Sequence, residues 1–277
     1  LTGIHRANTL WYSKAAFRKA GASLPASATF ADLSKAATKL KAAGIAPLCL
    51  GDKDIWTAAQ LLEETIIGET NASTWNNLSA GKASWADAKV QTAISHFNTM
   101  LTWANSDHKA LDWTGAVAAL AKGTCGMNVM GDWAYGELQV KQGKKDGIDF
   151  GYSVIGDAKT FVTVGDSFVI GSKSKNKAGA EAFIKAIMDP KVQVAFNKLK
   201  GSAPYRTDVS TATLGAYQRA AAKTLATGTL VASLVHGQQL VAASVSQAFS
   251  DGVTVLEANK DGNAFAKSMD AAAKAQA

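Results

Sequence analysis

Apolar residues recur at helical spacing in several segments of the chain, and short apolar runs separate these segments. Leu33, Ala36 and Leu40 fall on one face of a helix predicted over 31–43, and a glycine is placed to end it. The apolar run 45–50 that follows predicts a short buried strand. This succession of helix, glycine and apolar strand is typical of a layered α/β fold.

The same reasoning predicts the remaining elements. Strands are expected over 3–14, 125–130, 148–155 and 160–170. Helices are expected over 55–67, 86–104, 114–122, 190–200, 214–226, 238–250 and 262–275. Asp189 suits the N-cap of the helix that Pro190 begins.

The composition is that of a folded chain with a sizeable core. Hydrophobic residues make up 47% of the 277 residues and charged residues 18%, which excludes a disordered chain. The length allows one large domain or two ordinary ones, and no apolar run is long enough to span a membrane. The formal charge is +7, but the lysines are scattered along the chain. We therefore expect a solvated basic surface and no nucleic-acid partner.

Motifs for catalysis, cofactors and metals are missing from the sequence. There is no phosphate-binding loop, no GxGxxG after a strand and no GxSxG elbow, and the four histidines are dispersed. We predict no cofactor, no metal site and no enzymatic activity. Cys49 and Cys125 lie in apolar runs, so each is expected to be a buried apolar residue. A disulfide between them is the alternative in an oxidising compartment.

Seven tryptophans are present, and several follow a carboxylate or a glycine. Trp133 follows Gly131-Asp132, and Trp113 and Trp56 also lie close after an aspartate. Sugar recognition combines aromatic rings, which stack on the apolar face of a pyranose, with charged or planar groups that bind its hydroxyls. Packing in the core is the alternative role for each tryptophan taken singly.

The order of six motifs resembles a known family. The motifs are HRANTLWYSK, KLKAAGIAPLCLG, AKGTCGMNVMGDWAYG, VGDSFVIGSKSK, FNKLKGSAPYRTDV and SLVHGQ. Together they resemble the extracellular carbohydrate-binding proteins of bacterial ABC importers, most closely the glucose/mannose-binding proteins. The resemblance implies a two-lobe α/β fold of the type II periplasmic binding protein class, with hinge closure on the ligand.

The resemblance also implies a domain organisation. Residues 1–158 would form the first part of the C-terminal lobe, 159–214 the returning part of the N-terminal lobe, and 215–277 the helices of the C-terminal lobe. The first part of the N-terminal lobe is expected to be missing from this chain. Either it is a separate piece that acts as a partner, or the chain is a truncated or naturally short form. We then expect the apolar face of Phe183, Ile187, Val192 and Phe196 to be exposed, and the isolated chain to bind sugar weakly.

Four residues match the ligand-binding positions that the resemblance implies. Trp133 would stack on the pyranose, Asp166 would accept hydrogen bonds from hydroxyls, and Lys200 and His236 would bind further oxygens. The weaker candidates are His5, Asn8, Trp11 and Trp56. His5 and Asn8 are expected chiefly to bond the backbone of the hinge.

The implied function is a receptor that captures a glucose-like monosaccharide and delivers it to the permease subunits of an ABC importer. Its expected location is periplasmic or extracellular. One form of the protein would carry a lipid anchor before processing. Two alternatives remain: a truncated structural fragment that binds no sugar, and a carbohydrate-active enzyme. The enzyme would need two carboxyl groups about 5–10 Å apart across the sugar, and only Asp166 has support in the sequence.

Overall fold

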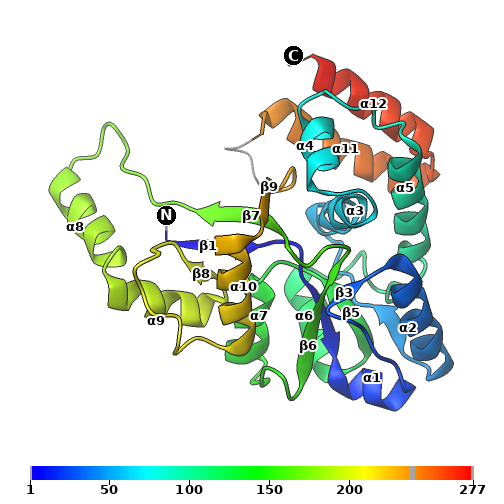
Figure 1. Ribbon diagram of the computed structural model, residues 1–277, viewed down its shortest axis with the longest axis horizontal. Helices are drawn as coiled ribbons and strands as arrows, with labels where there is room; N and C mark the ends of the chain where they lie inside the picture. Colours follow the sequence, from blue (N-terminus) through cyan, green and yellow to red (C-terminus); the bar gives the residue numbers. More distant parts are fainter. Residues whose placement is uncertain (1, 237–240, 276–277) are drawn as a thin grey trace.

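The computed structural model describes residues 2–236 and 241–275, which form two β-sheets surrounded by helices (Figure 1). The larger sheet has the strand order β3-β6-β2-β5-β4. Its strands are β2 (Leu10–Ser13), β3 (Ser27–Ala28), β4 (Ala46–Leu48), β5 (Cys125–Val129) and β6 (Phe150–Ile155). The central strand β2 is antiparallel to β5 and β6, whereas the outer strands β3 and β4 run parallel to their neighbours.

Helices pack around this sheet and extend beyond one end of it (Figure 1). Those of the first half are α1 (Lys14–Ala20), α2 (Phe30–Ala42), α3 (Trp56–Glu69), α4 (Ala72–Ser79), α5 (Ala88–Leu101) and α6 (Trp113–Lys122). Near the C-terminus, α11 (Ala243–Asn259) and α12 (Gly262–Lys274) pack against each other and against α3 and α5. None of the helices in the described residues is both long and apolar enough to cross a lipid bilayer.

α3 is the most deeply buried helix of this group. Every residue from Thr57 to Ile67 is buried, including the polar residues Gln60, Glu63 and Glu64. The helix is therefore enclosed by protein on all sides, and its polar side chains need partners inside the fold.

The smaller sheet has the strand order β8-β1-β7-β9. Its strands are β1 (Gly3–Arg6), β7 (Thr160–Asp166), β8 (Ala203–Pro204) and β9 (Thr229–Ala232). β1 is antiparallel to β7 with Gly3 opposite Asp166, and β9 runs parallel to β7 on the other side. The chain thus passes from the small sheet to the large one after β1, and returns between β6 and β7.

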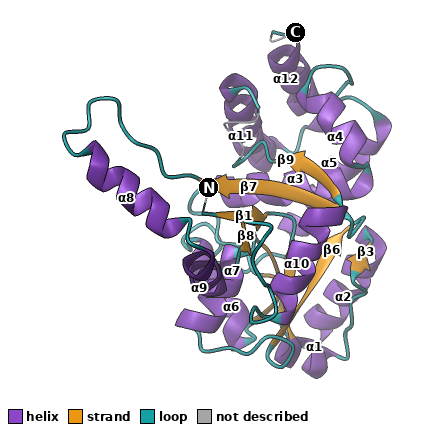
Figure 2. Cartoon of the chain, turned by 60° about the vertical axis from the view of Figure 1, so that its left-hand side comes forward, coloured by secondary structure: helices purple, strands orange, loops and turns teal. Residues whose placement is uncertain are grey.

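The helices next to the small sheet are arranged less compactly. They are α7 (Trp133–Gly136), a π-helical turn (Glu137–Lys141), α8 (Lys177–Ile187), α9 (Pro190–Lys200) and α10 (Ala216–Thr227). Figure 2 shows α8 and the loop before it projecting away from the rest of the molecule. Phe183 and Val192 are exposed as expected, whereas Ile187 and Phe196 are partly buried.

The largest differences between the element boundaries and the sequence predictions are in three places. The strand predicted over 3–14 is interrupted at 7–9, where the chain crosses between sheets, and Ser13 caps α1 through a bond from the Ala16 amide. The strand predicted over 160–170 ends at Asp166. The helix predicted over 238–250 is α11, which begins at Ala243 and continues to Asn259, and residues 238–240 of that prediction lie outside the described residues.

Several short elements were not predicted. They are α1, α4, α7, the π-helical turn, β3, β8 and β9. The side chain of Asn71 accepts a bond from the Thr74 amide at the start of α4, so an N-cap signal was present there. The two-residue strands β3 and β8 are too short to show an alternation of apolar and polar residues. Their pairing depends on a partner that is distant in sequence.

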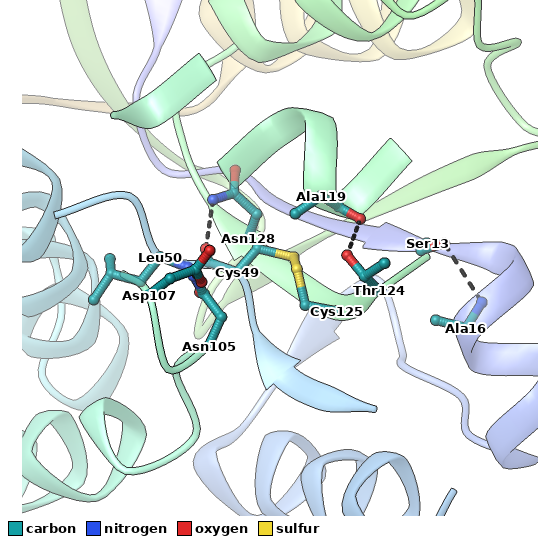
Figure 3. Close-up of a disulfide and its surroundings, with 10 residues drawn as sticks. All are labelled: Ser13, Ala16, Cys49, Leu50, Asn105, Asp107, Ala119, Thr124, Cys125 and Asn128. Atoms are coloured by element: carbon teal, nitrogen blue, oxygen red, sulfur yellow. Dashed lines mark hydrogen bonds between the residues drawn. A yellow bond between two sulfur atoms is a disulfide. The ribbon is translucent and has the colours of Figure 1, made fainter. Parts of the chain in front are cut away.

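Cys49 and Cys125 form a disulfide, which corrects the expectation of two separate buried cysteines (Figure 3). Their Cα atoms are 5.4 Å apart, because β4 and β5 run parallel and bring the two positions together. The Asn128 amide donates to the Cys49 carbonyl at 2.8 Å, and Asn105 accepts from the Leu50 amide at 2.8 Å. The disulfide therefore anchors the residues that follow β4, which are already hydrogen-bonded to the sheet.

We expect loss of this disulfide to destabilise the fold strongly. The two cysteines are 76 residues apart in sequence. Closing a loop of that length raises the free energy of the unfolded chain by about 4.5 kcal/mol at 25 °C, because it lowers the entropy of that chain. The double variant Cys49→Ala/Cys125→Ala should unfold at a lower denaturant concentration than the oxidised protein. Wild-type protein under reducing conditions is the control and should behave like the variant. Coincident unfolding curves for the oxidised protein and the variant would contradict this expectation.

Candidate functional site

A cavity of about 740 Å³ lies where the small sheet meets the ends of α3, α6, α7 and α9. Each of these elements contributes side chains to its wall. The cavity is lined by His5, Trp56, Trp113, Trp133, Gly136, Glu137, Val140, Lys141, Val164, Asp166, Leu199, Lys200, Val235 and His236. Val140 and Leu199 are more than half exposed, so the cavity has an apolar rim.

Three tryptophans and two histidines make up the aromatic part of the wall. The ring of His236 contacts Trp56 and Trp133 edge-on, with centroids 5.2 and 5.1 Å apart. Trp133 also meets His5 edge-on at 5.6 Å. Both Trp56 and Trp133 are partly exposed. Edge-on packing fixes the rings while leaving part of their surface accessible from the cavity.

The position of Trp133 depends on the glycine two residues before it. The Trp133 ring folds back over Gly131, where a Cβ atom would overlap with the indole. Its Nε1 atom donates to the sulfur of Met130 at 3.0 Å. The absence of a side chain at Gly131 therefore leaves the space that the Trp133 ring occupies.

The polar end of the cavity is a chain of charged groups. The Nδ1 atom of buried His5 bonds Asp132, and its Nε2 atom lies 3.2 Å from an oxygen of Asp166. The ammonium group of Lys200 lies 3.3 Å from the same Asp166 oxygen. Asp166 and Lys200 are both partly open to solvent, so they are the members of this chain that a ligand can reach.

These contacts determine the charge of the groups. Burial alone would lower the pKa of His5, but the attraction of Asp132 and Asp166 outweighs it and raises this pKa to about 9. The bond from His5, assisted by Lys200, lowers the pKa of Asp166 to about 2. At neutral pH the cavity therefore presents a protonated imidazole, a carboxylate and an ammonium group.

His236 differs from His5 in its charge, because its ring is neutral at pH 7. Burial, together with the positive charge of His5, lowers the pKa of His236 to about 4, so its ring is neutral at pH 7. Its Nε2 atom lies 3.1 Å from Oε1 of Gln60, whose other amide atom donates to the Ala7 carbonyl. Nε2 therefore carries the proton, and Nδ1 is left as an acceptor.

Residues 2–194 match the sequence pattern of the family described as "Bacterial extracellular solute-binding protein". The chain belongs to this family. Membership places it outside the cytoplasmic membrane, in the extracellular or periplasmic space. A disulfide is stable in that oxidising environment.

Curated relatives of this solute-binding protein carry related names. It is 31% identical over 262 residues to an uncharacterized ABC transporter extracellular-binding protein, PH1214, from Pyrococcus horikoshii, with 94% of this chain and 59% of the relative covered. It is 33% identical over 262 residues to a probable sugar-binding periplasmic protein of Brucella suis, with 91% and 60% covered. The chain thus spans about 60% of the length of the curated relatives it matches.

Solved structures share the fold. The bacterial solute receptor AcbH, described as preferring β-D-galactopyranose, superposes with a TM-score of 0.82 at 17% identity, covering 99% of this chain and 71% of that one. A chitin oligosaccharide binding protein superposes with a TM-score of 0.80 at 18% identity, covering 99% and 70%. The predicted type II periplasmic-binding-protein fold is confirmed.

Six of the residues singled out in the sequence lie in the wall of the cavity. Trp133, Asp166, Lys200 and His236 are there together, although they are up to 103 positions apart in sequence. Two of the weaker candidates, His5 and Trp56, join them.

Asn8 and Trp11 do not line the cavity. Trp11 is fully buried, donates to the Met130 carbonyl at 2.9 Å and packs on Tyr217. Asn8 is also buried, and its side chain bonds the backbone of Thr160 and Val162. The side chains of Asn8 and Trp11 are hydrogen-bonded inside the fold and do not reach this cavity. His5, expected to bond backbone as well, instead bonds the carboxyl groups of Asp132 and Asp166.

The remaining wall residues were not selected from the sequence. Trp113 carried the same signal as Trp56, a tryptophan soon after an aspartate, and could have been chosen. Glu137 and Lys141 lie on the π-helical turn, and nothing in their sequence pattern marks them. Over residues 2–236 and 241–275, no group of three or more His, Cys, Asp or Glu side chains is arranged to hold a metal ion.

The raised pKa of His5 predicts how stability depends on pH. Because the folded-state pKa lies near 9 and the ordinary value is 6.5, the stabilisation is complete below pH 6.5 and is lost as the pH rises through about 9. That difference corresponds to on the order of 3 kcal/mol. Thermal unfolding of His5→Gln should therefore show a lower Tm at pH 6 and a flatter profile between pH 6.5 and 9.

His96→Gln is the matched control for this measurement. His96 pairs with Glu69 outside the cavity, so its variant should retain the wild-type decline of Tm between pH 6.5 and 9. A His5→Gln profile that runs parallel to the wild-type profile would show that the bond network does not retain the proton on His5.

Proposed function

We propose that this chain is the ligand-binding part of a sugar receptor that delivers a glucose-like monosaccharide to an ABC importer. The observation that carries the proposal is one cavity that combines partly exposed tryptophans with a carboxylate, an ammonium group and two imidazoles. The relatives named as sugar-binding periplasmic proteins support the same conclusion. The permease subunits of the importer are the proposed membrane partner.

The arrangement of the wall suits a pyranose. The apolar C–H face of the sugar would stack on Trp133, whose ring has room to lie over Gly131. Asp166 would accept hydrogen bonds from two hydroxyls, and Lys200 would donate to another oxygen. His236, with its free Nδ1, would accept from a further hydroxyl.

We also propose that ligand binding closes a hinge. Trp133, Trp56 and His236 would belong to the C-terminal lobe, residues 1–158 and 215–277, and Asp166 and Lys200 to the other part, residues 159–214. The crossing segments at 7–9 and 156–159 connect the two sheets and are the proposed hinge. The exposed rim leaves water in contact with the sugar in the present conformation, so we expect millimolar affinity for this chain alone.

Replacing Trp133 should separate stacking from core packing. Trp133→Ala is expected to weaken hexose binding by about 1–3 kcal/mol with little change in Tm, because the ring is partly exposed in the cavity wall. Trp133→Phe retains a ring and should lose less. Saturation-transfer NMR titrations with D-glucose, D-mannose, D-galactose and D-xylose measure the affinities.

Phe168→Ala is the control for this series, because Phe168 is about half exposed and lies outside the cavity. Its affinity should equal that of the wild type. A large fall in Tm with unchanged affinity for Trp133→Ala would assign Trp133 to the core. Release of nitrophenol from nitrophenyl glycosides by the wild-type chain would favour an enzyme over a receptor.

Deoxy sugars should test the polar end of the cavity. A hexose that lacks one hydroxyl leaves Asp166, Lys200 or His236 without its partner, and an unpaired charged group is penalised more than the lost contact alone. We expect at least one monodeoxyglucose to bind tenfold or more weakly than glucose. Equal affinities across the 2-, 3-, 4- and 6-deoxy series would contradict the proposed hydrogen bonds.

A further inference from the structure

One face of α3 holds the segment that brings His236 to the cavity. Trp56, Gln60 and Glu63 stand at positions i, i+4 and i+7 of this helix, so they share a face. Trp56 contacts the His236 ring and Gln60 bonds its Nε2 atom. Glu63 bonds the start of the same segment, residues 233–236, which follows β9.

Glu63 makes several bonds to this segment. The Ser233 hydroxyl donates to its Oε2 atom at 2.8 Å, and the Leu234 amide donates to Oε1 at 2.6 Å. The Val235 amide also contacts the carboxyl group. Ser233 Oγ in turn accepts from the His236 amide at 2.9 Å. The carboxyl group thus holds the backbone of the segment directly and through one hydroxyl.

Core packing does not account for a glutamate at this position. Glu63 and Ser233 are fully buried, and neither lines the cavity. Burying a carboxyl group is unfavourable, and desolvation raises the pKa of Glu63 to about 7 despite its hydrogen bonds. An apolar side chain would fill the space without this penalty, but it would leave the amides of the segment without an acceptor.

The neighbouring Glu64 provides a contrast. It is as deeply buried as Glu63, and the charge that attracts it is that of Arg6 at the crossing segment. The two adjacent carboxyl groups therefore face different parts of the molecule. Gln60 connects these parts, because its amide group bonds His236 at one end and the Ala7 carbonyl at the other.

We propose that Glu63, together with Gln60, is a positioning residue of the binding site. It holds the backbone of 233–236 so that the His236 ring stands between Trp56 and Trp133 with Nδ1 available to a ligand. This inference rests on the proposed function of the cavity. Glu63 would thus act on the site without touching the ligand. Through Gln60 and Glu63, α3 would connect the crossing segment to the cavity wall.

The test uses the full 277-residue chain and four variants. Glu63→Leu removes the acceptor, and Ser233→Ala removes only the hydroxyl, a smaller change in case the first variant does not fold. Glu63→Gln keeps an acceptor for the Leu234 amide. Glu64→Gln is the matched control, since it alters an equally buried carboxyl group whose attracting charge is Arg6, whereas the bonds to Ser233 and Leu234 come from Glu63.

Two measurements separate positioning from general stability. The first is NMR titration of the His236 ring, assigned by its loss in His236→Asn. Its pKa, about 4 when buried, should rise towards 6.5 in Glu63→Leu and Ser233→Ala. The second is affinity for D-glucose, D-mannose, D-galactose and D-xylose, expected to fall about tenfold in these variants. Glu63→Gln should remain within about threefold of the wild type, and Glu64→Gln should match it.

An unchanged His236 pKa in folded Glu63→Leu or Ser233→Ala would overturn the proposal. Equal losses in Glu64→Gln and Glu63→Leu would do the same, because they would reflect stability alone. If the wild-type chain binds none of the four sugars, the proposed function fails, while the His236 titration still decides whether Glu63 positions the segment.

Discussion

A single buried guanidinium group joins the two crossing segments where the chain passes between the sheets. Arg6 donates to the carbonyls of Ala158 and Thr160, both at 2.8 Å, and to Asn8, which bonds the Thr160 carbonyl as well. The outgoing and returning strands are therefore fixed against each other at their crossing. An unpaired guanidinium in this position would be strongly unfavourable, and the register of β1 against β7 places the carbonyls that pair with it.

The polar end of the cavity is a consequence of that register. With β1 and β7 aligned, His5 lies within reach of Asp166, and the turn after β5 brings Asp132 to its other nitrogen. The Arg6 amide also donates to Asp132 at 2.9 Å. The residue that anchors the crossing and the residue that charges the cavity are thus neighbours in sequence. Any movement at the crossing would alter the distance between the two parts of the cavity wall.

The cavity combines two kinds of wall on different elements. Its aromatic side comes from the starts of α3, α6 and α7, where Trp56, Trp113 and Trp133 each stand at the first helical position. Its charged side comes from the ends of β7 and α9, with Asp166 and Lys200. Helix and strand ends are suitable places for such groups, because side chains there leave the packed layers and reach a common space.

Sequence patterns determined the fold class and most of the long elements, because helical spacing and apolar runs are local properties of the chain. The resemblance carried by six motifs implied Trp133, Asp166, Lys200 and His236 as ligand-binding candidates, and the structure brings them to one cavity. What the tertiary structure alone decided is which buried polar groups bond the segment that carries His236. Glu63 and Gln60 lie in a helix whose apolar residues predicted only packing, and their partners are about 170 residues away. The burial of Trp11 and the pairing of Cys49 with Cys125 depend equally on long-range contacts. Local sequence carries no record of such contacts, since they exist only when distant strands are brought into register.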